Sequence, residues 1–113
     1  MLKKKNSFKD YISSAKFLIQ KKYTGKGKII GMGGSAGGLL MGAVVNESPE
    51  LFLGMIMAVP FVDTLTTNLD HTLPLTVSEF NEFGNAKEKK KHFNYIRSYS
   101  PYENIKKIKC QNR

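Results

Sequence analysis

The 113-residue sequence contains a single cysteine, only two arginines and no long hydrophobic run. Because Cys110 is the only cysteine, an internal disulfide is excluded, which is typical of proteins from a reducing cytosol. The longest nearly uncharged apolar stretch, residues 51–62, is shorter than the roughly 20 residues that a membrane-spanning helix needs. Residues 1–10 lack the uninterrupted apolar core of a signal peptide. We therefore expect a cytoplasmic protein with no membrane partner.

The scarcity of arginine also limits what the net charge of +9 can mean. The charge comes mostly from lysine clusters within residues 3–5, 87–91 and 106–109. Proteins that bind nucleic acids usually interleave arginines with aromatic residues on one face, and no RNA-binding or helix-turn-helix signature is present. We interpret the lysines as a solvated surface and expect no nucleic-acid partner. The composition, 41% hydrophobic and 24% charged, is that of one small globular domain.

The most informative stretch is residues 28–46, where a short apolar run is followed by glycines around one serine and then by helix-like sequence. This pattern predicts a strand, a tight turn and a helix. Residues 33–37 read Gly-Gly-Ser-Ala-Gly and fit the G-x-S-x-G nucleophile elbow. In that motif a serine on a strained turn presents its hydroxyl at the carboxyl end of a sheet. Ser35 is therefore a candidate nucleophile.

Two further expectations follow from the elbow. Side chains at Gly33 and Gly37 would collide with the incoming strand and the outgoing helix, which explains why both positions are glycine. The backbone N–H of Ala36 would donate to an oxyanion formed at the serine, and the positive end of the helix dipole would face the same oxygen. These roles belong to acyl-transfer chemistry.

The segments on either side of the elbow complete a predicted βαβ unit. Residues 7–10 have the S-x-x-D form of a capping box and begin an amphipathic helix that ends near residues 23–27. Its apolar stripe consists of Phe8, Tyr11, Ile12, Ala15, Leu18 and Ile19. After the elbow helix, Ser48 is a predicted cap and Pro49 the first residue of a short helical turn. Residues 54–59 are then predicted to form a parallel strand buried on both faces.

Beyond the βαβ unit the pattern is weaker. It predicts a helical turn over residues 64–70, a loop over 71–76, and a short helix over 77–83 that ends at a Gly-Asn pair. Residues 87–97 are charged, with Phe93 and Ile96 on one side, and another capped turn is predicted over residues 100–104.

Several spaced motifs make residues 6–106 resemble the catalytic domain of the prolyl oligopeptidase family of serine peptidases. The motifs lie at residues 6–8, 33–42, 59–63, 74–76, 83–85 and 98–102. The resemblance implies an α/β protein with a partial α/β-hydrolase fold, in which parallel strands with flanking helices form an incomplete sheet around the nucleophile elbow. Residues 1–113 would then be a fragment of the catalytic domain, without the β-propeller that usually accompanies it.

The resemblance also implies roles for individual residues. Ser35 would be the acyl-forming nucleophile and the N–H of Ala36 half of the oxyanion hole. The sequence is most similar to the branch of the family that cleaves peptides after Arg or Lys, and Glu79 matches one of two acidic residues that hold the basic P1 side chain there. The second acidic position is Asn81, which weakens the predicted preference for Arg or Lys. No cofactor or metal is expected.

The same resemblance implies that essential parts lie outside this sequence. In the family the triad residues follow in the order Ser, Asp, His, which would place the last two beyond Arg113. We therefore expect an internal piece of the enzyme that turns over little or no substrate by itself, because a serine hydroxyl without a base is a poor nucleophile near neutral pH. Its expected partners are a peptide substrate and other chains that supply the rest of the hydrolase domain.

An internal triad is the weaker alternative. Asp63 with His71 or His92 has the right chain order, but we interpret Asp63 as a helix cap and both histidines as surface residues.

Two further hypotheses stay open. Residues 31–36 also satisfy G-x-G-x-x-A, the dinucleotide fingerprint, which then needs an acidic residue about 20 positions later, and Asp63 is too distant. Alternatively, the chain is a non-catalytic remnant of a broken gene or one part of a split enzyme. Two parallel strands leave unpaired edges and an uncovered apolar face, so we expect poor solubility for the chain alone.

Overall fold

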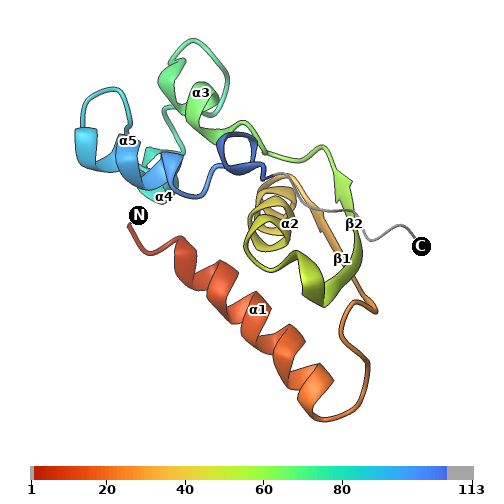
Figure 1. The fold of residues 1–113 in the computed structure, drawn as a ribbon. Helices are drawn as coiled ribbons and strands as arrows, with labels where there is room; N and C mark the ends of the chain where they lie inside the picture. The colour runs from red at the N-terminus through yellow and green to blue at the C-terminus, as the bar shows by residue number, and fades with distance from the viewer. Residues whose placement is uncertain (1, 107–113) are drawn as a thin grey trace.

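The computed structural model describes residues 2–106, so Cys110 lies outside the described residues (Figure 1). The elements are α1 (Lys5–Gln20), β1 (Ile29–Gly34), α2 (Ala36–Glu47), η1 (Pro49–Leu51), β2 (Phe52–Ala58), α3 (Thr64–Leu69), α4 (Phe80–Phe83), α5 (Lys90–Arg97) and η2 (Tyr102–Asn104). None of the helices within residues 2–106 is long and apolar enough to cross a membrane.

Helix α1 forms on the predicted apolar stripe but not from the predicted cap. Its buried residues are Phe8, Ile12 and Ala15. The capping-box prediction is wrong, because Ser7 and Asp10 lie inside a helix that begins at Lys5 without a side-chain cap. The backbone N–H of Lys5 instead donates to the hydroxyl of Tyr95 at 3.0 Å. A partner from a distant part of the chain therefore satisfies one N–H of the first turn of this helix.

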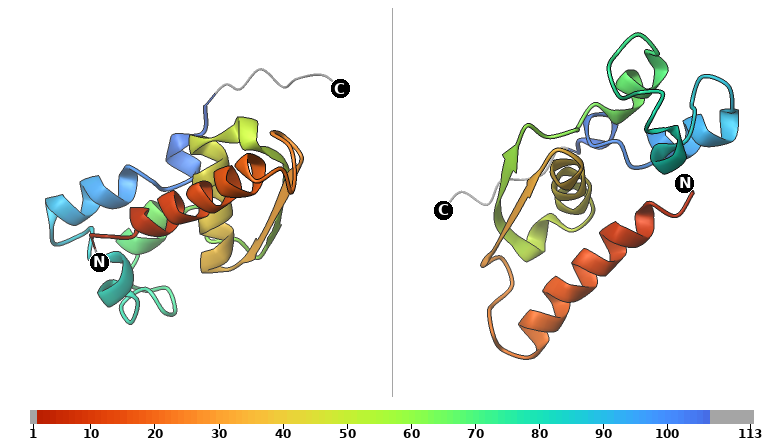
Figure 2. Two further views of the ribbon diagram at one scale, coloured as in Figure 1. Left: turned by 90° about the horizontal axis from the view of Figure 1, so that it is seen from below. Right: turned by 180° about the vertical axis from the view of Figure 1, so that it is seen from behind.

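Strands β1 and β2 form a parallel two-stranded sheet, connected through α2. The register runs from Ile29 opposite Phe52 to Gly34 opposite Ala58, with an irregularity just after Ile29. Helix α2 packs on both strands and α1 packs on α2, so the two helices cover the same side of the sheet (Figures 1 and 2). The predicted strand, helix, strand order is confirmed.

The other face of the sheet is open, so the prediction of a strand buried on both faces is wrong for the described residues. The exposed side chains are Ile30, Met32, Leu53 and Ile56, which are 54% to 74% accessible. Strand β2 also begins two residues earlier than the predicted residues 54–59. A nearly continuous apolar strand indicates cover on both sides. Here α1 and α2 supply that cover on one side.

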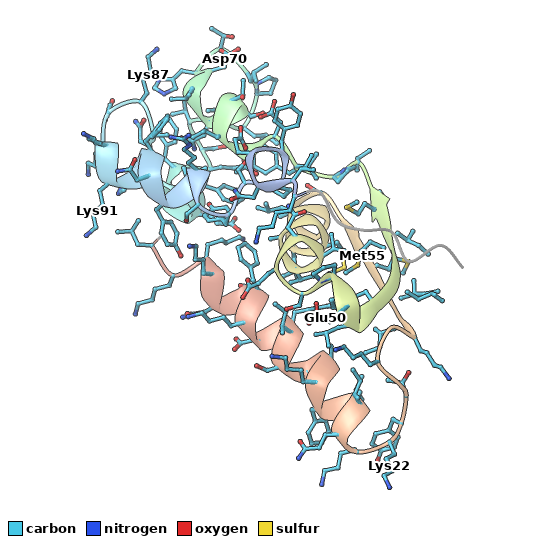
Figure 3. The ribbon with its side chains drawn as sticks, viewed as in Figure 1. Lys22, Glu50, Met55, Asp70, Lys87 and Lys91 are labelled. Atoms are coloured by element: carbon cyan, nitrogen blue, oxygen red, sulfur yellow. The ribbon has the colours of Figure 1, made fainter. Side chains whose placement is uncertain are left out.

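The hydrophobic core lies between α1, α2 and the sheet and continues toward α5. Its buried members include Phe8, Leu39, Val44, Phe52, Phe83 and Ile96. The connection into β2 is close to the prediction: Pro49 is the first residue of η1, although Ser48 makes no side-chain cap hydrogen bond. Lysines such as Lys22, Lys87 and Lys91 are exposed at the periphery (Figure 3).

The C-terminal third contacts the second half of α2 through Pro101, the residue before η2. The side-chain amide of Asn46 donates to the carbonyl of Pro101 at 3.0 Å, and Pro101 packs so closely on Gly42 that a Cβ there would lie 2.9 Å from the proline ring. The helical turn predicted over residues 64–70 is α3, and the helix predicted over 77–83 is shortened to α4. Gly84 ends α4 with a φ of 94°, as a C-terminal glycine commonly does.

Candidate active site

Ser35 occupies the turn between β1 and α2, as the elbow motif predicts. Its backbone has φ 51° and ψ −117°, a region that residues with a side chain rarely adopt. Such a conformation costs about 1–3 kcal/mol and persists only where neighbouring groups hold it. Ser35 is exposed, at the carboxyl end of the strand and immediately before the first turn of α2. The strained, accessible serine is the feature that a nucleophile elbow requires.

Hydrogen bonds hold both sides of the Ser35 peptide. The N–H of Ser35 donates to the carbonyl of Ala58 at the end of β2 at 3.0 Å. The carbonyl of Ser35 accepts from the N–H groups of Gly38, Leu39 and Phe61 at 3.0, 3.2 and 3.1 Å. The end of β2 and the residues that follow it thus fix the strained turn from outside the elbow motif.

The glycine predictions are half right. A Cβ on Gly33 would lie 2.3 Å from the carbonyl oxygen of Gly37, so a side chain at position 33 is excluded as predicted. A Cβ on Gly37 would meet no atom of the described residues within 4 Å, so the predicted collision at position 37 is wrong. The collision occurs one residue later, because a Cβ on Gly38 would lie 2.6 Å from the Cα of Pro60. At position 37 it is the backbone that approaches β1.

Val59, which the sequence predicts as the last residue of a strand, instead begins the turn that follows β2. Val59 has a φ of 40° and its side chain is 85% exposed. It lies between Ala58 and Phe61, whose backbones both hydrogen-bond to Ser35 from outside the elbow motif. The sequence gives no local signal for this conformation, because a residue before proline normally favours extended backbone.

The N–H of Ala36 is available for the predicted role of oxyanion donor. Ala36 is the first residue of α2, and the first N–H groups of a helix have no acceptor inside it. No acceptor for this group is found among residues 2–106. Because the N-terminus of α2 carries the positive end of the helix dipole, an anion beside Ser35 would be stabilised.

The structure does not assemble the alternative internal triad. Asp63 occupies the N-cap position of α3 as predicted, but its carboxylate makes no cap hydrogen bond, and its Oδ1 is buried with no partner among the described residues. The ring of His71 packs edge-on against Phe80 at 5.1 Å between centroids. The Nε2 of His71 is likewise buried without a partner, and neither side chain hydrogen-bonds to Ser35 within residues 2–106.

His92 is not the surface residue that the sequence suggested. It is 7% exposed, and its Nδ1 accepts a hydrogen bond from the N–H of Asn85 at 3.0 Å. The lysines around it in the sequence point outward while the imidazole fills the space beside Gly84. We therefore assign His92 a structural role, because one ring nitrogen is already engaged with the backbone.

Glu79 lies at the start of α4, on a different element from Ser35. It occupies the N-cap position and is half-buried, and its N–H donates to the carbonyl of Leu75 at 2.9 Å. Asn81, two residues later, is exposed. On the next turn, the carboxylate of Glu82 forms an ion pair with the ammonium of Lys4, which ties α4 to the N-terminal end of α1.

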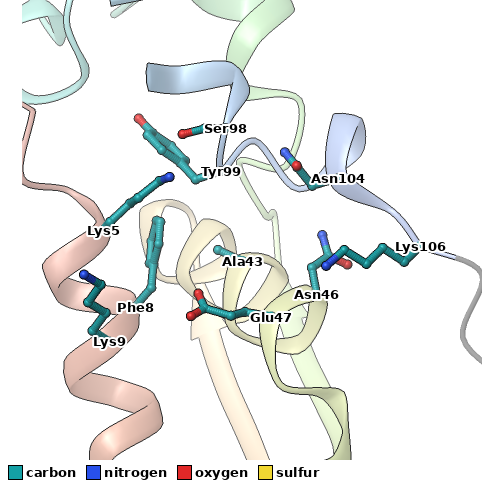
Figure 4. A pocket seen from close by; sticks show the side chains of 10 residues that line it. All are labelled: Lys5, Phe8, Lys9, Ala43, Asn46, Glu47, Ser98, Tyr99, Asn104 and Lys106. Atoms are coloured by element: carbon teal, nitrogen blue, oxygen red, sulfur yellow. The ribbon is translucent and has the colours of Figure 1, made fainter. Parts of the chain in front are cut away.

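A cavity of about 360 Å³ lies away from this site, between α1, α2 and residues 98–106 (Figure 4). Its walls include Lys5, Phe8, Asn46 and Tyr99 but neither Ser35 nor Glu79. Burial raises the pKa of the Tyr99 hydroxyl well above its ordinary value, and the neighbouring Tyr95 and Glu82 raise it further. Among the described residues, no cluster of three side chains could hold a metal ion.

Comparison with known proteins gives consistent matches over nearly the whole chain. The model of the prolyl oligopeptidase family matches residues 1–112. Protease 2 from Moraxella lacunata is 50% identical over 105 residues, which are 93% of this chain and 15% of that protein. Dipeptidyl aminopeptidase BI from Pseudoxanthomonas mexicana is 49% identical over 100 residues, 88% of this chain and 14% of that protein.

Solved structures agree. Oligopeptidase B from Leishmania major superposes with a TM-score of 0.90 at 46% identity, over 94% of this chain and 15% of that one. Oligopeptidase B from Trypanosoma brucei, in a closed form with covalently bound antipain, gives a TM-score of 0.90 at 45% identity, with the same coverage. The chain therefore spans about 15% of the length of the proteins that it matches.

Proposed function

This chain belongs to the prolyl oligopeptidase family, and we propose that it carries the nucleophile segment of a serine peptidase similar to oligopeptidase B. Its fold is a partial α/β-hydrolase fold, as the resemblance implied. The single observation that carries the proposal is the backbone of Ser35, which is strained, exposed and held at the end of a parallel strand. Hydrolysis of peptides through an acyl-enzyme is the chemistry that this geometry supports best.

In the proposed reaction the Oγ of Ser35 attacks the carbonyl carbon of the scissile peptide bond and a base takes its proton. The negative charge that develops on the carbonyl oxygen is stabilised by the N–H of Ala36 and by the N-terminus of α2. Expulsion of the amine leaves an acyl group on Ser35, and attack by water releases the acid and restores the hydroxyl. The proton acceptor comes from another segment of the enzyme.

We propose a preference for cleavage after Arg or Lys, with the carboxylate of Glu79 pairing with the basic P1 side chain. The resemblance of Glu79 to an acidic subsite residue supports this, and its position at the start of α4 leaves the carboxylate half-buried. Asn81 stands where the second acidic residue is expected. In an active complex, Glu79→Gln should raise KM for an Arg substrate with a smaller change in kcat, and Asn81→Asp should lower it. A peptidase without a basic preference would respond to neither substitution.

We propose that the chain is inactive alone and that other polypeptide segments complete the site. In support, one face of the sheet is apolar and exposed, and within the described residues no hydrogen bond joins Ser35 to His71 or His92. The test is a fluorophosphonate probe applied to the purified chain, with Ser35→Ala as the control. We expect no labelling that depends on Ser35. Such labelling would show that a base is present and would refute the proposed inactivity.

The open sheet face favours a split enzyme or a non-catalytic remnant as the second candidate. Co-expression with the neighbouring reading frames separates the two. A soluble complex that cleaves after Arg or Lys and reacts with the probe at Ser35 supports a split enzyme, whereas absence of association supports a remnant. In either case we expect the chain alone to be poorly soluble and its location to be cytoplasmic.

The dinucleotide hypothesis has less support in the fold. Asp63 lies at the start of α3, beyond the end of β2 where a ribose-binding carboxylate is expected. A thermal shift with millimolar NAD would support it, and no shift would remove it.

A further inference from the structure

The turn that follows β2 is connected to both halves of the proposed site. On one side, the N–H of Phe61 donates to the carbonyl of Ser35 at 3.1 Å. On the other side, the ring of Phe61 packs edge-on against the ring of Phe83, with centroids 5.4 Å apart and planes inclined by 70°. Phe61 therefore joins the strained backbone of the nucleophile turn to α4.

Phe83 is held more firmly than an ordinary ring at the end of a short helix. It is 2% exposed, and the ammonium of Lys4 lies over its ring at 4.9 Å from the centroid. The same ammonium forms the ion pair with Glu82, so one side chain contacts two neighbouring residues of α4. Figure 2 shows the N-terminal end of the chain beside α4. A four-residue helix is thus fixed between α1 and the turn that follows β2.

We propose that Phe83 is a positioning residue that acts through Phe61 on Ser35. An edge-to-face pair fixes the direction as well as the distance between two rings. The position of α4 therefore restrains the Phe61 ring and, with it, the backbone N–H of Phe61. That N–H is one of the groups that hold the unfavourable conformation of Ser35. Loss of the Phe83 ring would therefore loosen the nucleophile turn through Phe61.

The position of Glu79 gives this contact a second consequence, which rests on the proposed function. Glu79 is four residues before Phe83 and its carbonyl accepts the N–H of Phe83 at 3.0 Å. The contact between Phe61 and Phe83 therefore also sets the separation between the nucleophile turn and the carboxylate proposed to hold the P1 side chain. One buried pair of rings would align the reacting bond with the residue that selects the substrate.

The test is amide hydrogen exchange on the 113-residue chain at low micromolar concentration, comparing Phe83→Leu with Phe93→Leu. Phe93 is a partly buried phenylalanine of α5 that packs against the core, so it is the matched control for loss of a ring. In Phe83→Leu we expect the Phe61 amide and the peptide covering residues 35–39 to exchange about 3- to 10-fold faster than in the control, which corresponds to one aromatic pair. Equal rates in the two variants would overturn the proposal.

A second variant keeps the test decisive if Phe83→Leu fails to fold. Phe61→Leu removes the same contact by changing the half-buried ring of the pair. It should increase the exchange rate of the peptide covering residues 35–39. The double variant should exchange no faster than the faster single variant, because both substitutions remove one shared interaction. Fully additive acceleration would show two independent packing effects and would refute the coupling. Probe labelling of Ser35 in the co-expressed complex tests the proposed function separately, so failure of either idea is recognisable.

Discussion

The two outer glycines of the elbow motif should respond oppositely to the same substitution. Gly33→Ala places a Cβ 2.3 Å from the carbonyl oxygen of Gly37, whereas Gly37→Ala places one where no described atom lies within 4 Å. Relief of the first clash needs a movement of about 1 Å between the strand and α2, and overpacking of this kind costs about 1–3 kcal/mol. We expect a cost of about 3 kcal/mol for Gly33→Ala, because the clashing atom belongs to the backbone and cannot move away by a change of rotamer. Gly37→Ala should stabilise by about 0.4–1 kcal/mol, since it lies in a helix and removes glycine's freedom from the unfolded chain.

Thermal unfolding of dilute protein followed by circular dichroism measures the difference. For a domain of this size, 1 kcal/mol of stability corresponds to about 4–8 °C in Tm. A cost on the order of 3 kcal/mol should therefore lower the Tm of Gly33→Ala by at least about 10 °C. Gly37→Ala should raise Tm by a few degrees. Gly38→Ala serves as a second clash, against Pro60 at 2.6 Å. An equal loss of stability in Gly37→Ala and Gly33→Ala would refute this prediction, because the space around each Cβ would then not explain why the two positions are glycine.

Three further predictions concern strain and ionisation. Tyr99→Phe should raise stability by about 1 kcal/mol, because the hydroxyl is buried with no partner among the described residues. Burial raises the folded pKa of Tyr99, so the unfolded chain ionises first and stability falls as the pH rises above about 10; urea unfolding of Tyr99→Phe should lack that alkaline loss. Val59→Gly should stabilise the folded chain by about 1 kcal/mol in the same urea assay. The reason is that the Val59 side chain is 85% exposed and that its φ of 40° favours glycine. A loss of stability would show that the valine packs against other residues in solution. The hydroxyl and the N–H of Thr72 both donate to the carboxylate of Asp70 and lower the pKa of that carboxyl. A carbon-13 titration should therefore find the Asp70 pKa below its ordinary value, and Thr72→Val should raise that pKa. The stability that comes with the lowered pKa is present at neutral pH and is lost as the pH falls through the folded pKa.

The parts of the site that depend on local sequence could be predicted. The turn at Ser35, the helix after it and the exclusion of a side chain at Gly33 depend on residues within one strand, turn and helix unit. The parts that failed depend on distant segments. The start of α1 is satisfied by Tyr95, about 90 positions away, and not by the capping box that its own sequence suggested. The close approach at Gly38 comes from Pro60, which nothing in the motif specifies.

Burial was the least predictable property, because it depends on which segments pack together. His92 lies among lysines in the sequence, yet its ring is enclosed beside Gly84. The apolar pattern of β2 was interpreted as cover on both faces, and within residues 2–106 the helices cover one. Sequence patterns of this kind report the environment that a strand is suited to, whereas the structure shows which part of that environment the described residues supply.

The unit formed by β1, α2 and β2 closes within residues 29–58, and this has a consequence for how a peptidase of this family is made. Contacts between near neighbours in the chain cost little loop entropy, so such a unit forms rapidly compared with pairings that join remote segments. On a ribosome, about 30 consecutive residues contain the strand, turn and helix that surround the serine and the strand that pairs with them. We therefore expect the local geometry around the serine to form soon after this unit and the turn that follows it have been synthesised, and before the remaining parts of a hydrolase have assembled on it.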